Sequence, residues 1–491
     1  MSSIDESIDI FASVNVSIRL DRLPLLTASV RKLNQKTTNL GTEALSPIDC
    51  IVLSSPLFKF FHILFSLQFD DDAVWVLKVS ATGHRDRFDE FDAQALISEA
   101  LTMQLIKREI IVSIPKVYFF NVFIDNELNC FFILMKHLNE ASLYDCWFDN
   151  TSFKTMIEQR RSRILENVAT AMMQLNKFTY TQDDRLLFDK DGNSTSIELM
   201  RKLDLSFMLD GFHTDDFNDT FVFCELESFI NSKAFLLCML NRREPPLDKF
   251  SQEIYKLLRF FIDWFSYNDC AKEEEFVLSH SDLDIQNVLI SQENRLCELI
   301  DWDEVRTVSR CVENERYSSW LTRDWDSVKY DYDHEEEEAD TDCSENSSEE
   351  LALYRAMYLQ FMKRCLINEN RSKSDVVKNS SNNISLDDFA KLTRNFIIIE
   401  NLKIAADDSV CTHEIVNKIF DEIAELVREA HETVFQADQK DAHENEMWMN
   451  SDDSNIKDNF YLYEVACDLI DKNLDQRRLR WLKREFENLC S

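Results

Sequence analysis

The sequence predicts an α+β fold with two lobes. The smaller lobe is built on an antiparallel sheet with one helix, the larger lobe is mainly helical, and extra helices follow it. The chain has 491 residues, which is too long for one ordinary hydrophobic core. Apolar patterns between residues 51 and 135 come in the order strand, strand, helix, strand, strand, and helical spacing dominates after them.

The smaller lobe is predicted from short apolar runs and the polar turns between them. The acidic turn Asp70 to Asp72 separates the first two runs, and Asp125 to Glu127 separates the last two, so each pair indicates a hairpin. Between the hairpins, apolar residues recur three or four positions apart, as in a helix. The predicted elements are strands at 59–69 and 74–79, a helix at 91–108, and strands at 117–123 and 130–135.

Five segments are predicted along the chain. They are an N-terminal arm at 1–44, a small lobe at 45–138, a large lobe at 139–330, an acidic linker at 331–350 and a C-terminal helical extension at 351–491. The arm has no sustained period, so we expect it to be loosely attached or to form a short helix. The linker holds 11 acids and no Lys or Arg, and we expect it to stay extended in solvent.

Composition excludes several classes of function. The net charge of −36 argues against a nucleic-acid partner, because phosphate backbones are held by clustered cations. The most apolar stretch, residues 56–69, is too short and too interrupted to span a membrane. The 13 cysteines form no C-x-x-C pair, and acids occupy the first residues, so we expect a reducing, cytoplasmic location without export. Nothing in the sequence identifies a protein partner.

The residues that carry chemistry lie between positions 277 and 303. Asp282 is followed five residues later by Asn287, and Asp301 follows a short predicted hairpin. A carboxylate can orient an attacking hydroxyl, and an amide oxygen with a second carboxylate can hold magnesium against phosphates. Taken alone, each residue has a structural explanation as a cap, a turn former or a surface acid. The combined pattern favours a site for phosphoryl transfer.

At these residues the sequence resembles the aminoglycoside phosphotransferase and choline kinase-like family. The segments 314–317 and 320–325 are similar to its filamentous-fungal branch. The resemblance implies a protein kinase-like fold that binds ATP, or GTP, and Mg between the lobes. It also implies that Asp282 is the catalytic aspartate, that Asn287 and Asp301 bind the metal, and that His280 holds the loop.

The smaller lobe holds the expected nucleotide-binding residues. Lys78 matches the strand lysine that contacts phosphates, and Glu99 matches the helix glutamate that pairs with it. An edge lysine and a solvated helix glutamate are the alternatives, which the large-lobe motif disfavours. The segment from Lys136 to Leu138 is expected to be the hinge whose backbone meets the adenine.

The glycine-containing turn of a kinase is missing from this sequence. Only 4 glycines are present, and the segment matched to the turn, residues 53–58, is bulky. The five matched residues Asp282, Asn287, Asp301, Lys78 and Glu99 nevertheless favour an ATP- and Mg-dependent kinase that phosphorylates a hydroxyl of a small molecule, such as an aminoglycoside- or choline-like amino-alcohol or a metabolite. The alternative is a pseudokinase or a binding or regulatory protein with a degraded phosphate loop.

Overall fold

The computed structural model describes most of the chain. The described residues are 11–38, 49–203, 223–265, 275–373, 386–440, 462–470 and 476–490, except for gaps at 54–55, 60–61, 89, 139, 150, 152, 183–184, 199, 227–228, 230, 292, 294, 304, 311–316, 327–329, 331 and 333–344. The chain forms two compact units. Unit 1 contains residues 1–147, 184–228 and 278–307, and unit 2 contains residues 148–183, 229–277 and 308–491.

Unit 1 is built on an antiparallel sheet of six strands. Five of them follow the order β1-β3-β4-β6-β5, and β2 also pairs with β3. The strands are β1 (Cys50–Val52), β2 (Leu57–Lys59), β3 (His62–Phe69), β4 (Val74–His84), β5 (Val117–Asn121) and β6 (Cys130–Lys136). With helix α3 (Glu90–Glu109) between β4 and β5, the predicted α+β class and both predicted hairpins are confirmed.

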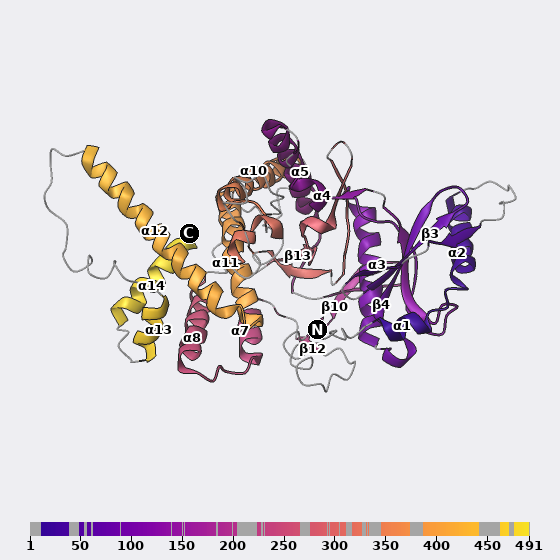
Figure 1. Cartoon of the computed structure of the whole chain (residues 1–491), viewed down its shortest axis with the longest axis horizontal. Helices are drawn as coiled ribbons and strands as arrows, with labels where there is room; N and C mark the ends of the chain where they lie inside the picture. Colours follow the sequence, from indigo (N-terminus) through magenta and orange to yellow (C-terminus); the bar gives the residue numbers. More distant parts are fainter. Residues whose placement is uncertain are drawn as a thin grey trace, which may run out of the picture. The chain divides into compact units, whose positions relative to one another are not determined.

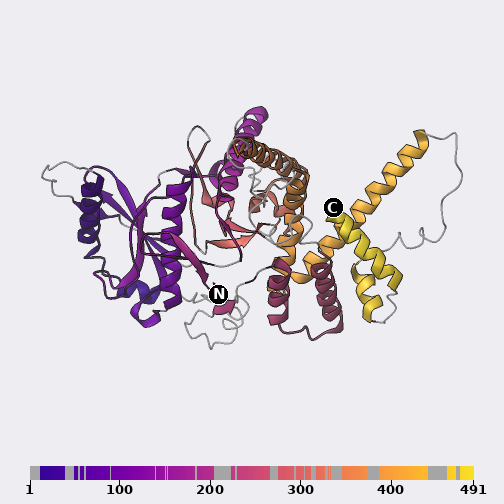
Figure 2. The same ribbon diagram turned by 180° about the vertical axis from the view of Figure 1, so that it is seen from behind.

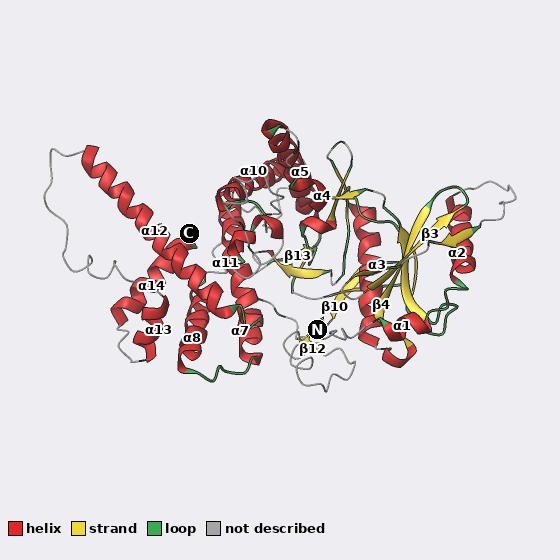
Figure 3. Ribbon diagram, in the orientation of Figure 1, coloured by secondary structure: helices red, strands yellow, loops and turns green. Residues whose placement is uncertain are grey.

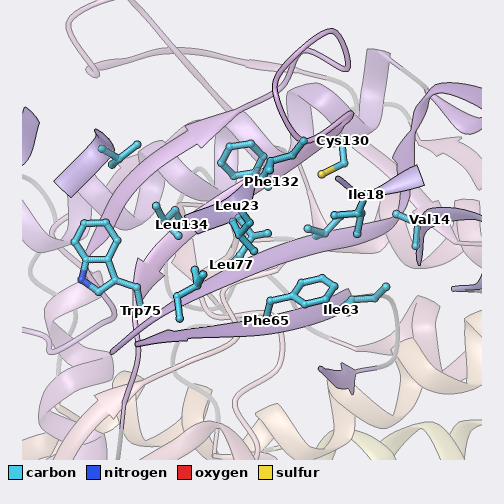
Figure 4. Packing of buried hydrophobic residues seen from close by; sticks show 14 of the residues in the cluster. Val14, Ile18, Leu23, Ile63, Phe65, Trp75, Leu77, Cys130, Phe132 and Leu134 are labelled. Carbon is cyan, nitrogen blue, oxygen red and sulfur yellow. The ribbon is translucent and has the colours of Figure 1, made fainter. Parts of the chain in front are cut away.

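The two faces of this sheet have different roles because side chains alternate along each strand. Figure 1 and Figure 2 show α2 (Leu23–Thr38) on one face and α3 on the other. Toward α2 the strands bury Ile63, Phe65, Leu77 and Phe132, which form the packed cluster in Figure 4. The intervening positions, including Lys78, face the other way. The core therefore places the polar residues of β4 on the α3 side.

The N-terminal segment is part of this core. Helix α1 (Ala12–Ser17) and α2 contribute Val14, Ile18 and Leu23 to the cluster, and the Arg19 N–H donates to the carbonyl oxygen of Leu128 at 3.0 Å. Of the two expectations for this segment, the loosely attached arm is therefore wrong for residues 11–38, whereas a short helix is present at α1. The apolar positions of these two short helices are separated by a turn, which hides their common face in a periodicity analysis.

Replacing Leu23 with Ala is expected to lower the free energy of unfolding by about 2–5 kcal/mol. Leu23 is fully buried, so its removal leaves a cavity against the sheet. Leu25→Ala is the matched control, because Leu25 lies in the same helix and is 64% exposed. It should change unfolding by no more than about 0.5 kcal/mol. Urea denaturation of both variants measures the difference, and equal effects would contradict the packing described here.

The rest of unit 1 consists of short elements that carry the loops of the site. These are 3-10 helix η1 (Arg85–Arg87), β7 (Ala141–Ser142), α4 (Tyr144–Trp147), β9 (Arg185–Phe188), β10 (Ser194–Glu198), β11 (Met200–Leu203), β12 (Phe223–Leu226), 3-10 helix η2 (Ile285–Asn287), β14 (Val288–Ile290) and β15 (Leu296–Leu299). Strand β14 pairs antiparallel with both β15 and β7. Strands β13 (Phe276–Ser279) and β16 (Arg306–Ser309) cross the sequence boundaries between the units.

Unit 2 is mainly helical, as Figure 3 shows. Its elements are α5 (Lys154–Leu175), β8 (Thr179–Tyr180), α7 (Ser232–Arg242), α8 (Lys249–Trp264), 3-10 helices η4 (Ser319–Leu321) and η5 (Arg323–Trp325), α10 (Ser348–Lys373), α11 (Leu386–Asp407), α12 (Thr412–Lys440), α13 (Leu462–Ile470) and α14 (Gln476–Leu489). Helix α8 packs against α7, α12, α13 and α14. Phe261 of α8 stacks on Phe486 of α14, with ring centroids 4.7 Å apart.

The end of the predicted acidic linker is folded. The run Glu335 to Glu338 lies outside the described residues. Glu345 forms an ion pair with Arg323 at 2.9 Å, Asn346 is buried, and α10 begins at Ser348. The expectation of an extended linker up to residue 350 is therefore wrong for its last six residues, because acids there have specific partners. No helix in the described ranges is long and apolar enough to cross a membrane.

Candidate functional site

The first part of the site is an ion pair inside unit 1. Lys78 of β4 donates from Nζ to Oε1 of Glu99 in α3 at 2.8 Å, and both side chains are more than nine-tenths buried. Strand alternation turns Lys78 toward α3, and the helix presents Glu99 to it. The two residues that the sequence analysis paired are therefore in contact.

Asp303 is a second partner of Lys78 that the sequence analysis missed. Its Oδ1 also accepts a hydrogen bond from Lys78 Nζ, and its Oδ2 lies 3.2 Å from Nδ1 of His62. Burial alone would lower the pKa of Lys78, but the carboxylates of Asp303, Glu99 and Asp301 outweigh it and raise that pKa. Burial also lowers the pKa of His62 to about 4 against the attraction of Asp303, so the imidazole is neutral at pH 7. The position of Asp303, two residues after Asp301, places it near the site in sequence but does not indicate its contact with Lys78.

The catalytic loop predicted around Asp282 is held by His280. The loop follows β13, and His280 is fully buried, with its Nε2–H donating to the carbonyl oxygen of Ile300 at 2.8 Å. The ring of His280 also packs on Trp302, with centroids 4.6 Å apart. These contacts tie the loop to the segment that carries Asp301.

Asp282 and Asn287 are bonded to one another. Asn287 Nδ2 donates to Oδ2 of Asp282 at 2.8 Å and to its carbonyl oxygen at 2.9 Å. Asp282 is exposed, whereas Asn287 is 1% exposed. The Oδ1 atom of Asn287 is buried and has no hydrogen-bond partner among the described residues. A buried amide oxygen without a donor is costly unless something binds it.

Asp301 is placed beside Asn287 by backbone pairing. The Ile300 N–H donates to the carbonyl oxygen of Asn287 at 3.0 Å, and Val288 pairs with Leu299 in the hairpin. Asp301 has a left-handed backbone with φ of 65°. A non-glycine residue held in that region is an unusual feature that clusters at functional sites. The structure therefore brings Asp282, Asn287 and Asp301 together in unit 1.

These residues fit a magnesium ion that also binds nucleotide phosphates. Among the described residues, no three His, Cys, Asp or Glu side chains are grouped to hold a metal by themselves. Magnesium needs no such cage, because it is bound by one or two carboxylates together with phosphate oxygens and water. The unpartnered Oδ1 of Asn287 and the carboxylate of Asp301 would supply oxygen ligands of the required kind.

The predicted hinge is only partly available for a ligand. The Lys136 N–H donates to the carbonyl oxygen of Lys116 at 2.9 Å, and the His137 N–H donates to that of Val74 at 3.2 Å. The side chain of Lys136 pairs with Glu298 at 3.1 Å. Within the described part of the hinge, the Leu138 N–H is the one left without a backbone partner.

Part of the segment that was matched to the kinase turn, residues 53–58, is strand. Leu57 and Phe58 belong to β2 and pair with Leu64 and Ile63, so they are strand residues. Residues 60–61, which follow β2, lie outside the described residues together with Ser54 and Ser55. Residues 50–53 and 57–59 line the same edge of β3, and Pro56 between them gave the sequence the appearance of a turn.

Comparisons with known proteins give matches among solved structures. No family model matches the chain, and no curated protein matches it. A macrolide 2'-phosphotransferase type I is 12% identical, with 80% of this chain and 97% of that chain covered and a TM-score of 0.36. A thermostable mutant of aminoglycoside phosphotransferase APH(4)-Ia, in complex with AMP-PNP and hygromycin B, is 12% identical, with coverage of 79% and 98% and a TM-score of 0.34.

An ethanolamine kinase of Plasmodium vivax is 10% identical, with 98% of this chain and 97% of that chain covered and a TM-score of 0.35. The structural neighbours of this chain thus include aminoglycoside and macrolide phosphotransferases and an ethanolamine kinase, all at low sequence identity.

Proposed function

We propose that this chain is an ATP- and magnesium-dependent phosphotransferase that acts on a hydroxyl group of a small molecule. One observation carries the proposal. The Lys78–Glu99 pair, the Asp282–Asn287 pair and Asp301 all lie in unit 1, and the buried Oδ1 of Asn287 lacks a partner there.

Each group has a role that phosphoryl transfer requires. Lys78 would bind phosphates while Glu99 holds its ammonium in place. Asn287 and Asp301 would hold magnesium, which neutralises the charge that develops on the phosphates. Asp282 is exposed and acts on the acceptor, because a carboxylate can orient a hydroxyl and take its proton. Leu138 would meet the base of ATP or GTP with its free N–H.

The proposed acceptor is a class of small molecules that carry a hydroxyl group. An amino-alcohol or another hydroxylated metabolite fits an acidic protein with a net charge of −36, because such a surface attracts cations. The cytoplasmic location expected from the cysteines is consistent with ATP as the donor.

A pseudokinase is the second candidate, and Asp303 favours it. The Asp303 carboxylate accepts a hydrogen bond from the Lys78 ammonium group, to which a phosphate would bind in a kinase. The segment 53–62 also contains no glycine to admit phosphates near the backbone.

Titration of the purified chain with ATP and GTP, with and without magnesium, is the test. The enzyme proposal predicts tighter binding with magnesium and ADP release that rises when amino-alcohols or aminoglycosides are added. Nucleotide binding without ADP release under any acceptor would support the pseudokinase. If no nucleotide bound, both the ATP-dependent enzyme and a nucleotide-binding pseudokinase would be excluded.

A further inference from the structure

His62 lies at the N-terminal end of strand β3. It is the first residue of β3 and pairs with Lys59, the last residue of β2. In the sheet it pairs with Ser80, while Leu64 pairs with Lys78. Lys78 lies opposite Leu64, and His62 is two residues from Leu64 on the same strand. His62 and Lys78 are therefore diagonal neighbours on one face of the sheet.

One carboxylate bridges the two side chains. Asp303 contacts Lys78 with Oδ1 and His62 with Oδ2, 3.2 Å from Nδ1. A neutral imidazole carries one N–H, and Nδ1 is the ring nitrogen that lies beside this carboxylate. The backbone of Asp303 is fixed independently, since its carbonyl oxygen accepts a hydrogen bond from Ser281 Oγ at 2.5 Å. The backbone of Asp303 therefore has an anchor that does not depend on the contacts of its carboxylate.

A nucleotide phosphate offers the same chemistry as the Asp303 carboxylate. Both present anionic oxygens that accept hydrogen bonds from ammonium and imidazole N–H groups. In a turn without glycine, Cβ atoms keep the backbone N–H groups away from phosphates. A side-chain donor at the end of the turn can supply the missing hydrogen bond.

We propose that His62 is a phosphate-binding residue that replaces the glycine-rich turn, and that Asp303 occupies its donor until a nucleotide displaces it. This inference rests on the proposed function, because it concerns how the same site binds ATP. The incoming phosphate takes the hydrogen bonds of Lys78 and His62, and the Asp303 side chain turns away.

The first test measures how tightly His62→Ala binds ATP and how tightly it binds adenosine, which has no phosphate. We expect the Kd for ATP to rise about tenfold, because a hydrogen bond to a charged group is lost, and the Kd for adenosine to stay unchanged. His62→Gln keeps an N–H donor and should restore part of the affinity. Ser66→Ala, on the same face of β3, is the control. Equal weakening of ATP and adenosine, or no rescue by Gln, would show a structural role and overturn the inference.

The second test removes the competing carboxylate. Asp303→Asn should bind ATP at least about threefold more tightly without magnesium, since the anion that competes for Lys78 and His62 is gone. Asp125→Asn makes the same charge change at an exposed site and should not alter binding. Unchanged or weaker binding by Asp303→Asn would overturn the displacement. If the wild type binds ATP and His62→Ala binds it equally well, the inference fails alone; if the wild type binds none, the proposed function fails first.

Discussion

Replacing Asp282 with Asn is expected to lower phosphoryl transfer by about 100- to 10,000-fold while ATP still binds, because general-base catalysis typically contributes that factor. The amide keeps an oxygen that can accept the hydrogen bond from Asn287 Nδ2, now 2.8 Å from Oδ2, so the loop should keep its shape. The substitution removes the charge and the basicity that act on the acceptor hydroxyl. Single-turnover ADP release and a separate ATP titration measure the two effects.

Asp284→Asn is the matched control for this experiment. Asp284 lies in the same loop, and its side chain accepts a hydrogen bond from the Ile285 N–H at 2.7 Å to cap η2. An amide oxygen can also make this cap, so transfer should stay near the wild-type rate. Asp282 would lose its assigned role if Asp282→Asn transferred phosphate normally, or if it failed to bind ATP.

Replacing Asp301 with Asn is expected to abolish most of the effect of magnesium on ATP affinity. Loss of a side chain that only hydrogen-bonds a metal ligand already costs about 10- to 100-fold in metal affinity, and the loss of a carboxylate ligand should cost at least as much. Asn is a better replacement than Ala here because Asp301 has φ of 65°, a conformation that Asn tolerates. Titrations of ATP at several magnesium concentrations measure the loss, and a melting curve checks that the variant folds.

The other ligand should show a smaller effect in the same direction. Asn287→Ala removes a neutral amide oxygen, which binds magnesium more weakly than a carboxylate. Asp70→Ala changes an exposed acid in the turn between β3 and β4 and should leave magnesium dependence intact. The metal assignment would be wrong if Asp301→Asn and the wild type showed the same response to magnesium.

The parts of the molecule that sequence reasoning predicted depend on local signals. The run of apolar residues along β3 and β4 predicted the hairpin, and the helical spacing of apolar residues in α3 predicted the helix. Both patterns follow from backbone geometry. Asp282 and Asn287 lie five residues apart in one loop, so their contact needed no knowledge of distant packing.

The parts that it missed depend on contacts between distant segments. Asp303 meets Lys78 across 225 positions, and nothing in the local sequence of either residue indicates the other. The role of His62 required the pairing register of β2, β3 and β4, which fixes its neighbours across the strands. The packing of the N-terminal helices on the sheet was missed for the same reason. Their apolar residues form a common face only where they contact the sheet.

The position of α8 in unit 2 has a consequence for synthesis of the protein. Phe261 stacks on Phe486, which the ribosome adds 225 residues later. At about 5–20 residues per second, the apolar face of α8 waits roughly 10–45 s for this partner. During that interval Phe261 and its buried neighbours Leu257 and Leu258 are exposed to other nascent chains. Chaperone binding to the growing chain would therefore be of most use after α8 has left the ribosome and before α14 has been made.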